Sequence, residues 1–117
     1  MSKRAGGNDD LIFRIRQSMR QIEFRSGLHE IDLTSRAILY FIGECAADQR
    51  QLNVSDIIHG PDFGSAPTVY ARLAELEKAG WIETRPDPED GRAKLVELTP
   101  HAERTFRKMS SEAAKLL

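Results

Sequence analysis

The sequence has a single cysteine, Cys45, among its 117 residues, so no disulfide can form within the chain. Such sparing use of cysteine is typical of proteins in a reducing cytoplasm. No apolar run approaches the roughly 20 residues that span a bilayer, and the N-terminus has no signal-peptide core. We therefore expect a cytoplasmic protein with no contact to a membrane.

An excess of charge of either sign is also missing. The chain has 17 basic and 18 acidic residues and a net charge of −1, so any nucleic-acid binding must come from local clusters. Its apolar content of 40% is enough for one core in a chain of this length. There are no internal repeats, and we expect a disordered tail over residues 1–8 and one domain over residues 9–117.

Motifs for catalysis or metal binding are absent from the sequence. His29, His59 and His101 are far apart along the chain, and no pair of them has the spacing of a metal site. Cys45 lies in an apolar stripe with Ile42, which indicates a buried core residue rather than a redox sensor. The chain also lacks a glycine-rich phosphate loop and a nucleophile–base pair. We predict neither an enzyme nor a bound metal or cofactor.

Capping residues and glycine stops predict four helices before residue 80. The first begins at the caps Asn8–Asp10 and ends at Gly27. The second begins at the cap Thr34 and continues to about residue 47. A short third helix covers residues 54–59, with its cap at residue 53 or 55, and a fourth covers residues 66–79.

Two strand patterns and a last helix follow. The segments WIETR, residues 81–85, and AKLVEL, residues 93–98, flank a polar loop and predict an antiparallel hairpin. Thr99 is then a cap followed by Pro100 in the first turn of a helix that continues to the C-terminus.

The helices at residues 54–59 and 66–79 are joined by a tight, glycine-containing turn, which is the arrangement of a helix-turn-helix. A hairpin after the second helix makes this a winged helix-turn-helix, with the wing at about residues 81–98. The predicted fold class is therefore α+β, mostly helical: a winged helix-turn-helix flanked by N- and C-terminal dimerisation helices.

The second helix of such a motif enters the DNA major groove, and its hairpin lies over the neighbouring backbone or minor groove. Small residues on the outer face of this helix let it approach the groove floor, and Arg92 forms the tip of the wing. Arg72 has the reach to contact guanine or a phosphate. The predicted DNA-binding residues are Ser65, Pro67, Thr68, Tyr70, Ala71, Arg72, Arg85, Arg92 and Lys94.

Both terminal helices carry an apolar stripe with the spacing of a coiled coil. The two stripes can pack on each other inside one chain, or they can form a two-fold interface with a second chain. Phe13 and Phe24 lie beside the first stripe and favour the interface, since one small domain rarely needs so much apolar helix surface. The predicted dimerisation residues are Ile12, Ile15, Met19, Ile22, Phe106, Met109 and Ala113.

The segment from residue 65 to residue 99 resembles the MarR family of bacterial transcription regulators. The residues that carry the resemblance are Leu73, Leu76–Lys78, Gly80, Ile82, Arg85, Pro88, Asp90, Arg92 and Leu98–Thr99. Members of this family commonly run longer, with an additional dimerisation helix, so the chain resembles a member shortened at its C-terminus. The resemblance implies a dimer on palindromic operators, often released by a small-molecule effector. It also implies that Asp90 supports Arg92 in the wing.

These observations predict a sequence-specific regulator of transcription that binds double-stranded DNA as a dimer and acts as a repressor. The alternative is a winged helix that binds another protein without specific DNA binding. This alternative is supported by the charge of residues 62–98, where five basic side chains face eight acidic ones, a balance of −3.

Overall fold

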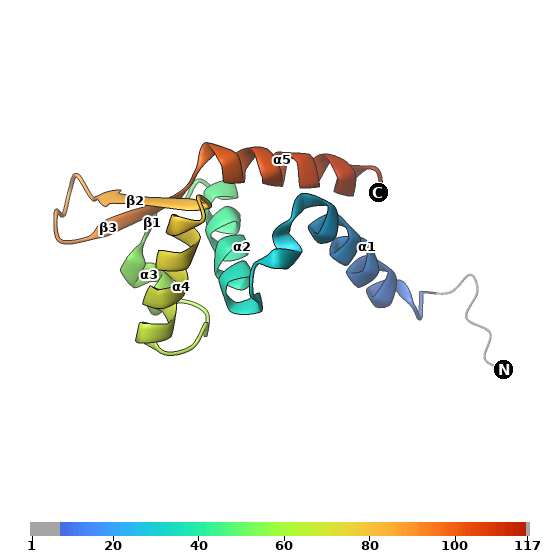
Figure 1. Cartoon of the computed structure of the whole chain (residues 1–117), viewed down its shortest axis with the longest axis horizontal. Coiled ribbons are helices and arrows are strands. Elements are labelled where there is room, and N and C mark those ends of the chain that lie inside the picture. The colour runs from blue at the N-terminus through green and yellow to red at the C-terminus, as the bar shows by residue number, and fades with distance from the viewer. Residues whose placement is uncertain (1–7, 117) are drawn as a thin grey trace.

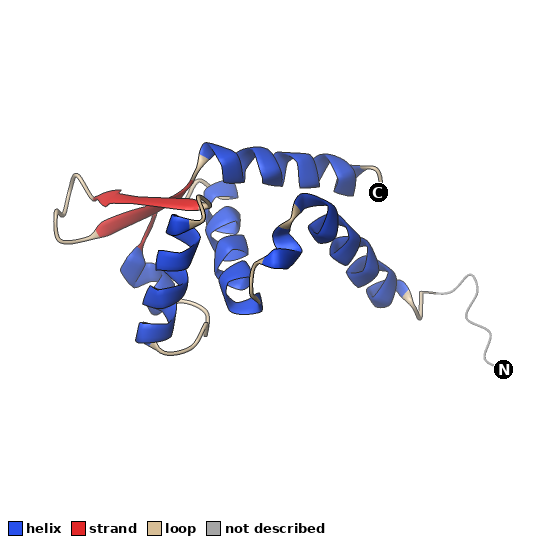
Figure 2. Cartoon of the chain, in the orientation of Figure 1, coloured by secondary structure: helices blue, strands red, loops and turns tan. Residues whose placement is uncertain are grey.

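The computed structural model describes residues 8–116, so the predicted tail over residues 1–8 lies outside the described residues except for Asn8. The mostly helical α+β fold is confirmed, and the predicted helices and strands occur in the predicted order, with one short 3₁₀ turn and one short strand in addition (Figure 2). The elements in chain order are α1 (Leu11–Ser26), the 3₁₀ turn η1 (Leu28–Glu30), α2 (Leu33–Ala47), β1 (Leu52–Asn53), α3 (Val54–Ile58), α4 (Ala66–Lys78), β2 (Ile82–Pro86), β3 (Lys94–Leu98) and α5 (Pro100–Ala114).

The start of α2 differs from the sequence prediction. Asp32, and not Thr34, is the cap: its carboxylate accepts hydrogen bonds from the backbone amide of Ser35 at 2.9 Å and from the Ser35 hydroxyl at 2.8 Å. An N-cap side chain satisfies an amide two or three residues further on, and the aspartate stands at that distance from Ser35. The helix therefore begins at Leu33, before the predicted cap.

Side-chain caps also begin α3 and α4. Asn53, one of the two predicted caps of α3, accepts from the amide of Asp56 at 2.8 Å, while the Asp56 carboxylate accepts from the amide of Asn53 at 3.0 Å. Ser65 accepts from the amide of Thr68 and begins α4. At its other end α4 stops before Gly80, whose φ of 84° suits a residue without a side chain.

The predicted hairpin is part of a three-stranded antiparallel sheet with the order β1-β3-β2. The sequence analysis missed β1, because a two-residue strand is too short to show an alternating pattern. In the sheet, Leu52 pairs with Val96, and Val96 pairs with Thr84 on its other side. At the base of the hairpin the Thr99 hydroxyl donates to the carbonyl of Gly80 at 2.6 Å, which joins the start of α5 to the end of α4.

Two apolar clusters hold the elements together. The larger one joins α2, α4 and the sheet through buried residues that include Ile38, Leu39, Ile42, Val69, Leu73, Leu76, Ile82 and Val96. In the smaller cluster, Ile22 of α1 and Met109 of α5 are buried with Leu28. Figure 1 shows the resulting arrangement: α2, α3, α4 and the sheet gather at one end, and α1 and α5 extend together away from them.

The burial of the two terminal stripes is uneven. Ile22 and Met109, predicted as dimer contacts, are 3% and 5% exposed and belong to the core of the chain itself. Ile12, Ile15 and Met19 are 58%, 49% and 37% exposed. Packing within one chain therefore buries the C-terminal part of the α1 stripe and leaves its N-terminal part exposed.

A network of polar contacts fixes α1 against α2. The Arg36 guanidinium donates to the carbonyls of His29 and Ile31 at 3.0 and 2.8 Å and lies 3.6 Å from the carboxylate of Glu23. The same carboxylate accepts from the Tyr40 hydroxyl at 2.7 Å. Burial, together with Glu23, raises the pKa of Tyr40 well above its usual value, so this tyrosine stays a hydrogen-bond donor.

Replacement of the α2 cap gives a direct test of this part of the fold. We expect Asp32→Ala to lower the free energy of unfolding by about 1 kcal/mol, because the amide of Ser35 loses its partner, whereas Asp32→Asn keeps the cap. Thr34→Ala is the control, and an equal loss in that variant would contradict the assignment. Denaturation by urea at pH 7 measures both.

The pKa of Asp32 adds a dependence on pH. Its hydrogen bonds from Ser35 lower this pKa below the usual value, so the charged carboxylate stabilises the folded state above about pH 4. That contribution is lost as the pH falls through the lowered pKa. The difference in stability between the wild type and Asp32→Asn should therefore shrink at lower pH.

Candidate nucleic-acid interface

The outward face of α4 is built mainly from small side chains. Val69, Leu73 and Leu76 are buried, and the opposite side of the helix carries four exposed residues at spacings of four, three and four. We call this row the outer ridge of α4. It consists of Pro67, Ala71, Ala74 and Lys78. The sequence analysis named Pro67 and Ala71 and missed the other two, which the same helical spacing would have found.

The residues at the start of α4 shape its first turn. Ser65 caps the helix, and its hydroxyl lies 3.0 Å from the hydroxyl of Thr68, which is half-buried. Tyr70 is 57% exposed and lies at the edge of α4 that faces the wing. Of the residues predicted on this helix, Ser65, Pro67, Tyr70 and Ala71 are exposed.

Arg72 lies on the other flank of α4, where two carboxylates hold it. Its guanidinium nitrogen Nη1 lies 2.8 and 2.9 Å from the two carboxylate oxygens of Glu75 and 3.8 Å from Oδ2 of Asp32, the cap of α2. The backbone amide of Ser35 lowers the pKa of Asp32, and the charge of Arg72 lowers it further. Arg72 thus connects α4 to the start of α2, a contact that the sequence did not indicate.

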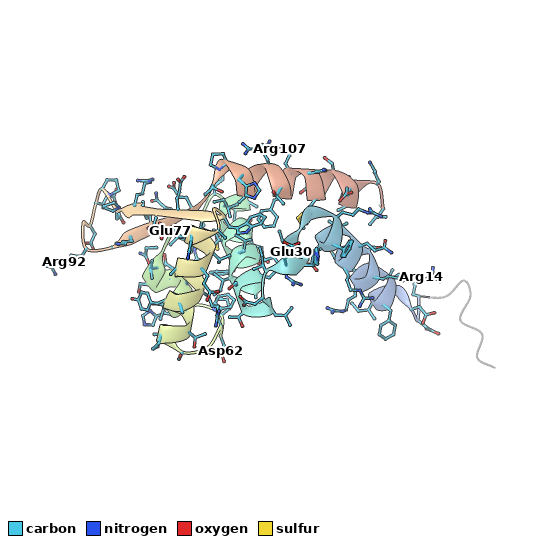
Figure 3. All side chains as sticks on the ribbon, in the orientation of Figure 1. Arg14, Glu30, Asp62, Glu77, Arg92 and Arg107 are labelled. Carbon is cyan, nitrogen blue, oxygen red and sulfur yellow. The ribbon has the colours of Figure 1, made fainter. Side chains whose placement is uncertain are left out.

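Acidic residues fold the wing loop. The carboxylate of Asp90 accepts from the backbone amide of Arg92 at 3.1 Å, and the carbonyl of Asp90 accepts from the amide of Ala93 at 2.9 Å. Asp87 accepts from the amide of Glu89 in the same way at 2.9 Å. Asp90 therefore supports Arg92 through the backbone, and among the described residues no ion pair joins the two side chains. Figure 3 shows Arg92 at the tip of the wing, pointing away from the body.

A groove of about 470 Å³ separates α4 from the wing. Tyr70, Ala74 and Glu77 line it from α4, and Arg92 and Lys94 line it from the wing. The groove therefore brings together three of the predicted DNA-binding residues.

The start of α3 closes the far side of the same groove. Asn53, Val54 and Ser55 line it there, and none of the three was predicted as part of the site. In the sequence these residues were recognisable only as the start of a helix, and a helix cap gives no indication of a ligand site.

Arg85 is separated from this group. Side chains alternate along a strand, so Arg85 projects from the opposite face of the sheet to Thr84, whose hydroxyl donates to Glu77 of α4 at 3.0 Å. Its guanidinium donates to Glu97 at 2.7 and 3.1 Å, and this hydrogen bonding raises the pKa of Arg85. The structure thus places Arg85 away from the predicted contacts of α4.

The acidic balance of residues 62–98 does not describe the face formed by α4 and the wing. Glu75 and Glu97 are paired with arginines, and Glu77 accepts from Thr84. Within the described part of the chain, the cations that take part in no ion pair include the three on this face. They are Lys78, Arg92 and Lys94. This face therefore presents three cations outside any ion pair, together with the carboxylate of Glu77, beside the small side chains of the ridge.

Neither a metal site nor a membrane span occurs among the described residues. No group of three or more histidine, cysteine, aspartate or glutamate side chains within residues 8–116 has a geometry that could hold a metal ion. None of the described helices is both long and apolar enough to cross a membrane.

Comparison with known proteins agrees with this geometry. The family model described as "Winged helix DNA-binding domain" matches residues 34–102, which is more than half of the chain and includes α3, α4 and the wing. Among curated proteins, none matches the sequence.

Solved structures of transcription regulators share the fold at low sequence identity. The complex of S. aureus MepR with DNA is 21% identical, with a TM-score of 0.66 over 91% of this chain and 81% of that one. A probable transcriptional regulator from Pseudomonas aeruginosa is 23% identical, with a TM-score of 0.54 over 94% of this chain and 86% of that one.

A putative MarR-like transcription regulator from Bacillus cereus is 17% identical, with a TM-score of 0.56 over 92% of this chain and 77% of that one. The predicted likeness to the MarR family is thus confirmed in the fold. The chain belongs to the family of winged helix DNA-binding domains, and its fold is that of the MarR-like transcription regulators.

Proposed function

We propose that the protein is a sequence-specific regulator of transcription that inserts α4 into the major groove of double-stranded DNA. The observation that carries the proposal is the combination, on one face, of a ridge of small side chains on α4 and the unpaired cations of the wing. The small side chains suit close approach to base edges, and the cations suit phosphates. The proposed contacts are Ser65, Pro67, Thr68, Tyr70, Ala71, Ala74, Lys78, Arg92 and Lys94.

Arg72 and Arg85 are outside this proposed set. Both guanidinium groups already donate to carboxylates, Arg72 to Glu75 and Arg85 to Glu97. To contact a phosphate, each would first have to give up a charge-assisted hydrogen bond.

We also propose that two copies of the chain associate through α1 and the end of α5. Leu11, Ile12, Phe13, Ile15 and Met19 are exposed there, which is unusual for a monomeric helix surface. A groove of about 360 Å³ runs between the two helices and is lined by Ile15, Met19, Ala113 and Leu116 among others. The exposed stripe of a second copy has the shape and chemistry to fill such a groove.

A dimer of this kind could act as a repressor that binds palindromic sites. Two α4 helices related by a two-fold axis fit successive major grooves about 34–36 Å apart, and the bound dimer then blocks access to a promoter. This role requires the protein to be in the cytoplasm, where the chromosome lies. A small-molecule effector that releases the protein from DNA stays a prediction of the MarR resemblance.

A second candidate function is binding to another protein through the same face. Glu77 lines the groove between α4 and the wing, and residues 62–98 carry a net charge of −3, which weakens attraction to phosphates. The two functions differ in their response to salt. Binding to duplex DNA weakens steeply as salt rises, because counterions are released from the phosphates.

The wing gives a prediction for DNA binding. We expect Arg92→Ala to weaken binding to all duplexes and to flatten the dependence of log K on log salt by about 0.9 for each phosphate that the wing no longer neutralises. The matched control is Arg107→Ala, which removes an arginine from α5 that points away from the α4–wing face (Figure 3). Electrophoretic mobility shifts or fluorescence anisotropy at several salt concentrations measure the slope.

The melting temperature of the Arg92→Ala protein should stay close to that of the wild type, since the side chain is exposed and unpaired. Unchanged DNA affinity in this variant, or an equal loss of affinity in Arg107→Ala, would rule out the wing as a DNA contact.

The exposed stripe gives a prediction for assembly. Ile15→Asp places a charge in the proposed interface without disturbing the core, because Ile15 is 49% exposed in the single chain. We expect this variant to sediment as a folded monomer at micromolar concentration, whereas the wild type and the control Gln21→Asp sediment as dimers. Met109 is unsuitable for this test, since its burial would make a charged variant unfold. A monomeric wild type would end the dimer proposal and leave DNA binding untouched.

A further inference from the structure

We infer that Asp32 and Glu75 hold Arg72 away from the bases, and that α4 selects its site through the C5-methyl groups of thymines. This inference rests on the proposed insertion of α4 into the major groove and concerns how the helix discriminates between sequences there. DNA as the ligand of α4 has a separate support, because the match to winged helix DNA-binding domains covers the whole of this helix. The ridge is used here only to infer which feature of the DNA is read.

The geometry of Arg72 carries the first part of the inference. Recognition of guanine by arginine needs both arms of the guanidinium fork, which donate to O6 and N7 of the base. In this structure Nη1 is 2.8 and 2.9 Å from the two oxygens of Glu75 and 3.8 Å from Asp32. To turn the fork toward a base, Nη1 would have to leave both oxygens of Glu75 and move away from the carboxylate of Asp32. Arg72 is therefore a positioning residue that joins α4 to the start of α2.

The outer ridge of α4 carries the second part. Pro67, Ala71 and Ala74 are exposed over the first three turns, and their side chains offer no hydrogen-bond donor or acceptor. Lys78, the fourth member of the ridge, lies at the end of the helix. N-terminal residues of a recognition helix are those that reach base edges. Discrimination by this ridge thus depends on apolar contact.

The major groove offers one apolar feature for such contact, the methyl group on C5 of thymine. Alanine is among the side chains that meet it. Cytosine lacks the methyl group, and 5-methylcytosine carries one at the same ring position. We therefore expect half-sites with thymines opposite the first turns of α4, and we expect 5-methylcytosine to replace thymine there.

The experiment begins with a duplex that the full-length protein selects from a random pool. Each thymine of the selected half-site is then replaced by uracil, which removes only the methyl group, and each guanine by 7-deazaguanine, which removes only N7. We expect uracil to weaken binding about fourfold for each contacted methyl group, the factor that corresponds to burial of one such group. Replacement of a contacted thymine–adenine pair by 5-methylcytosine–guanine should retain more affinity than replacement by cytosine–guanine. The 7-deazaguanine duplexes should bind like the original.

Protein variants connect the methyl effect to the ridge. In Ala71→Gly and Ala74→Gly the loss of affinity caused by uracil should shrink at one position of the half-site for each variant. Ala37→Gly is the matched control, because it replaces an exposed helical alanine of α2 that is not part of the ridge and carries a similar cost in helix stability. Its response to uracil should equal that of the wild type.

A last variant tests the restraint on Arg72. Asp32→Asn with Glu75→Gln keeps the cap of α2 and removes both charges that hold the guanidinium. The freed arginine should tighten binding to all duplexes and steepen the salt slope by about 0.9 if it reaches one phosphate. The addition of Arg72→Ala should abolish this gain.

The outcomes separate the inference from the proposed function. Equal affinity for uracil and thymine duplexes, or a loss of affinity with 7-deazaguanine that Arg72→Ala removes, would overturn the inference and leave specific DNA binding in place. No change in affinity or salt slope in the double variant would overturn the restraint on Arg72. Failure to enrich any duplex from the pool would remove the proposed function and the inference together.

Discussion

The packing of α4 on α2 determines which side chains of α4 are exposed to a ligand. Val69, Leu73 and Leu76 pack into the same core as the apolar face of α2, and this burial fixes the rotation of α4 about its own axis. The ridge on the opposite side then faces outward. A rotation by one residue, about 100°, would expose core side chains and bury others, so the core decides which residues are presented.

Acidic side chains serve the same arrangement from the surface. Asp32 caps α2 and faces Arg72, and Asp90 folds the wing loop beneath Arg92. Within residues 62–98, Asp87 and Asp90 accept from backbone amides and Glu75 and Glu97 pair with arginines, while Lys78, Arg92 and Lys94 take part in none of these ion pairs. Surface pairs of this kind contribute little to stability, about 0–1 kcal/mol each, but they decide which cations are left unpaired.

The terminal helices divide their apolar residues between two tasks. Ile22 and Met109 close the smaller cluster within the chain, whereas Ile12, Ile15 and Met19 stay exposed. Since α1 diverges from α5 toward its N-terminal end (Figure 1), one chain does not cover the whole stripe. The C-terminal part of the α1 stripe therefore packs against α5 within the chain. Its N-terminal part is free to form the proposed interface.

Most of the elements and their order could be predicted from the residues alone, because caps, glycine stops and apolar spacing are local signals that need no tertiary contacts. Helical periodicity was likewise enough to put Pro67 and Ala71 on the outer face of α4. The fold was needed to show that Arg72 is held by Asp32 and that Arg85 faces away from α4 with Glu97. Those pairings join residues far apart in the chain, and their partners follow from how the helices and strands pack against one another.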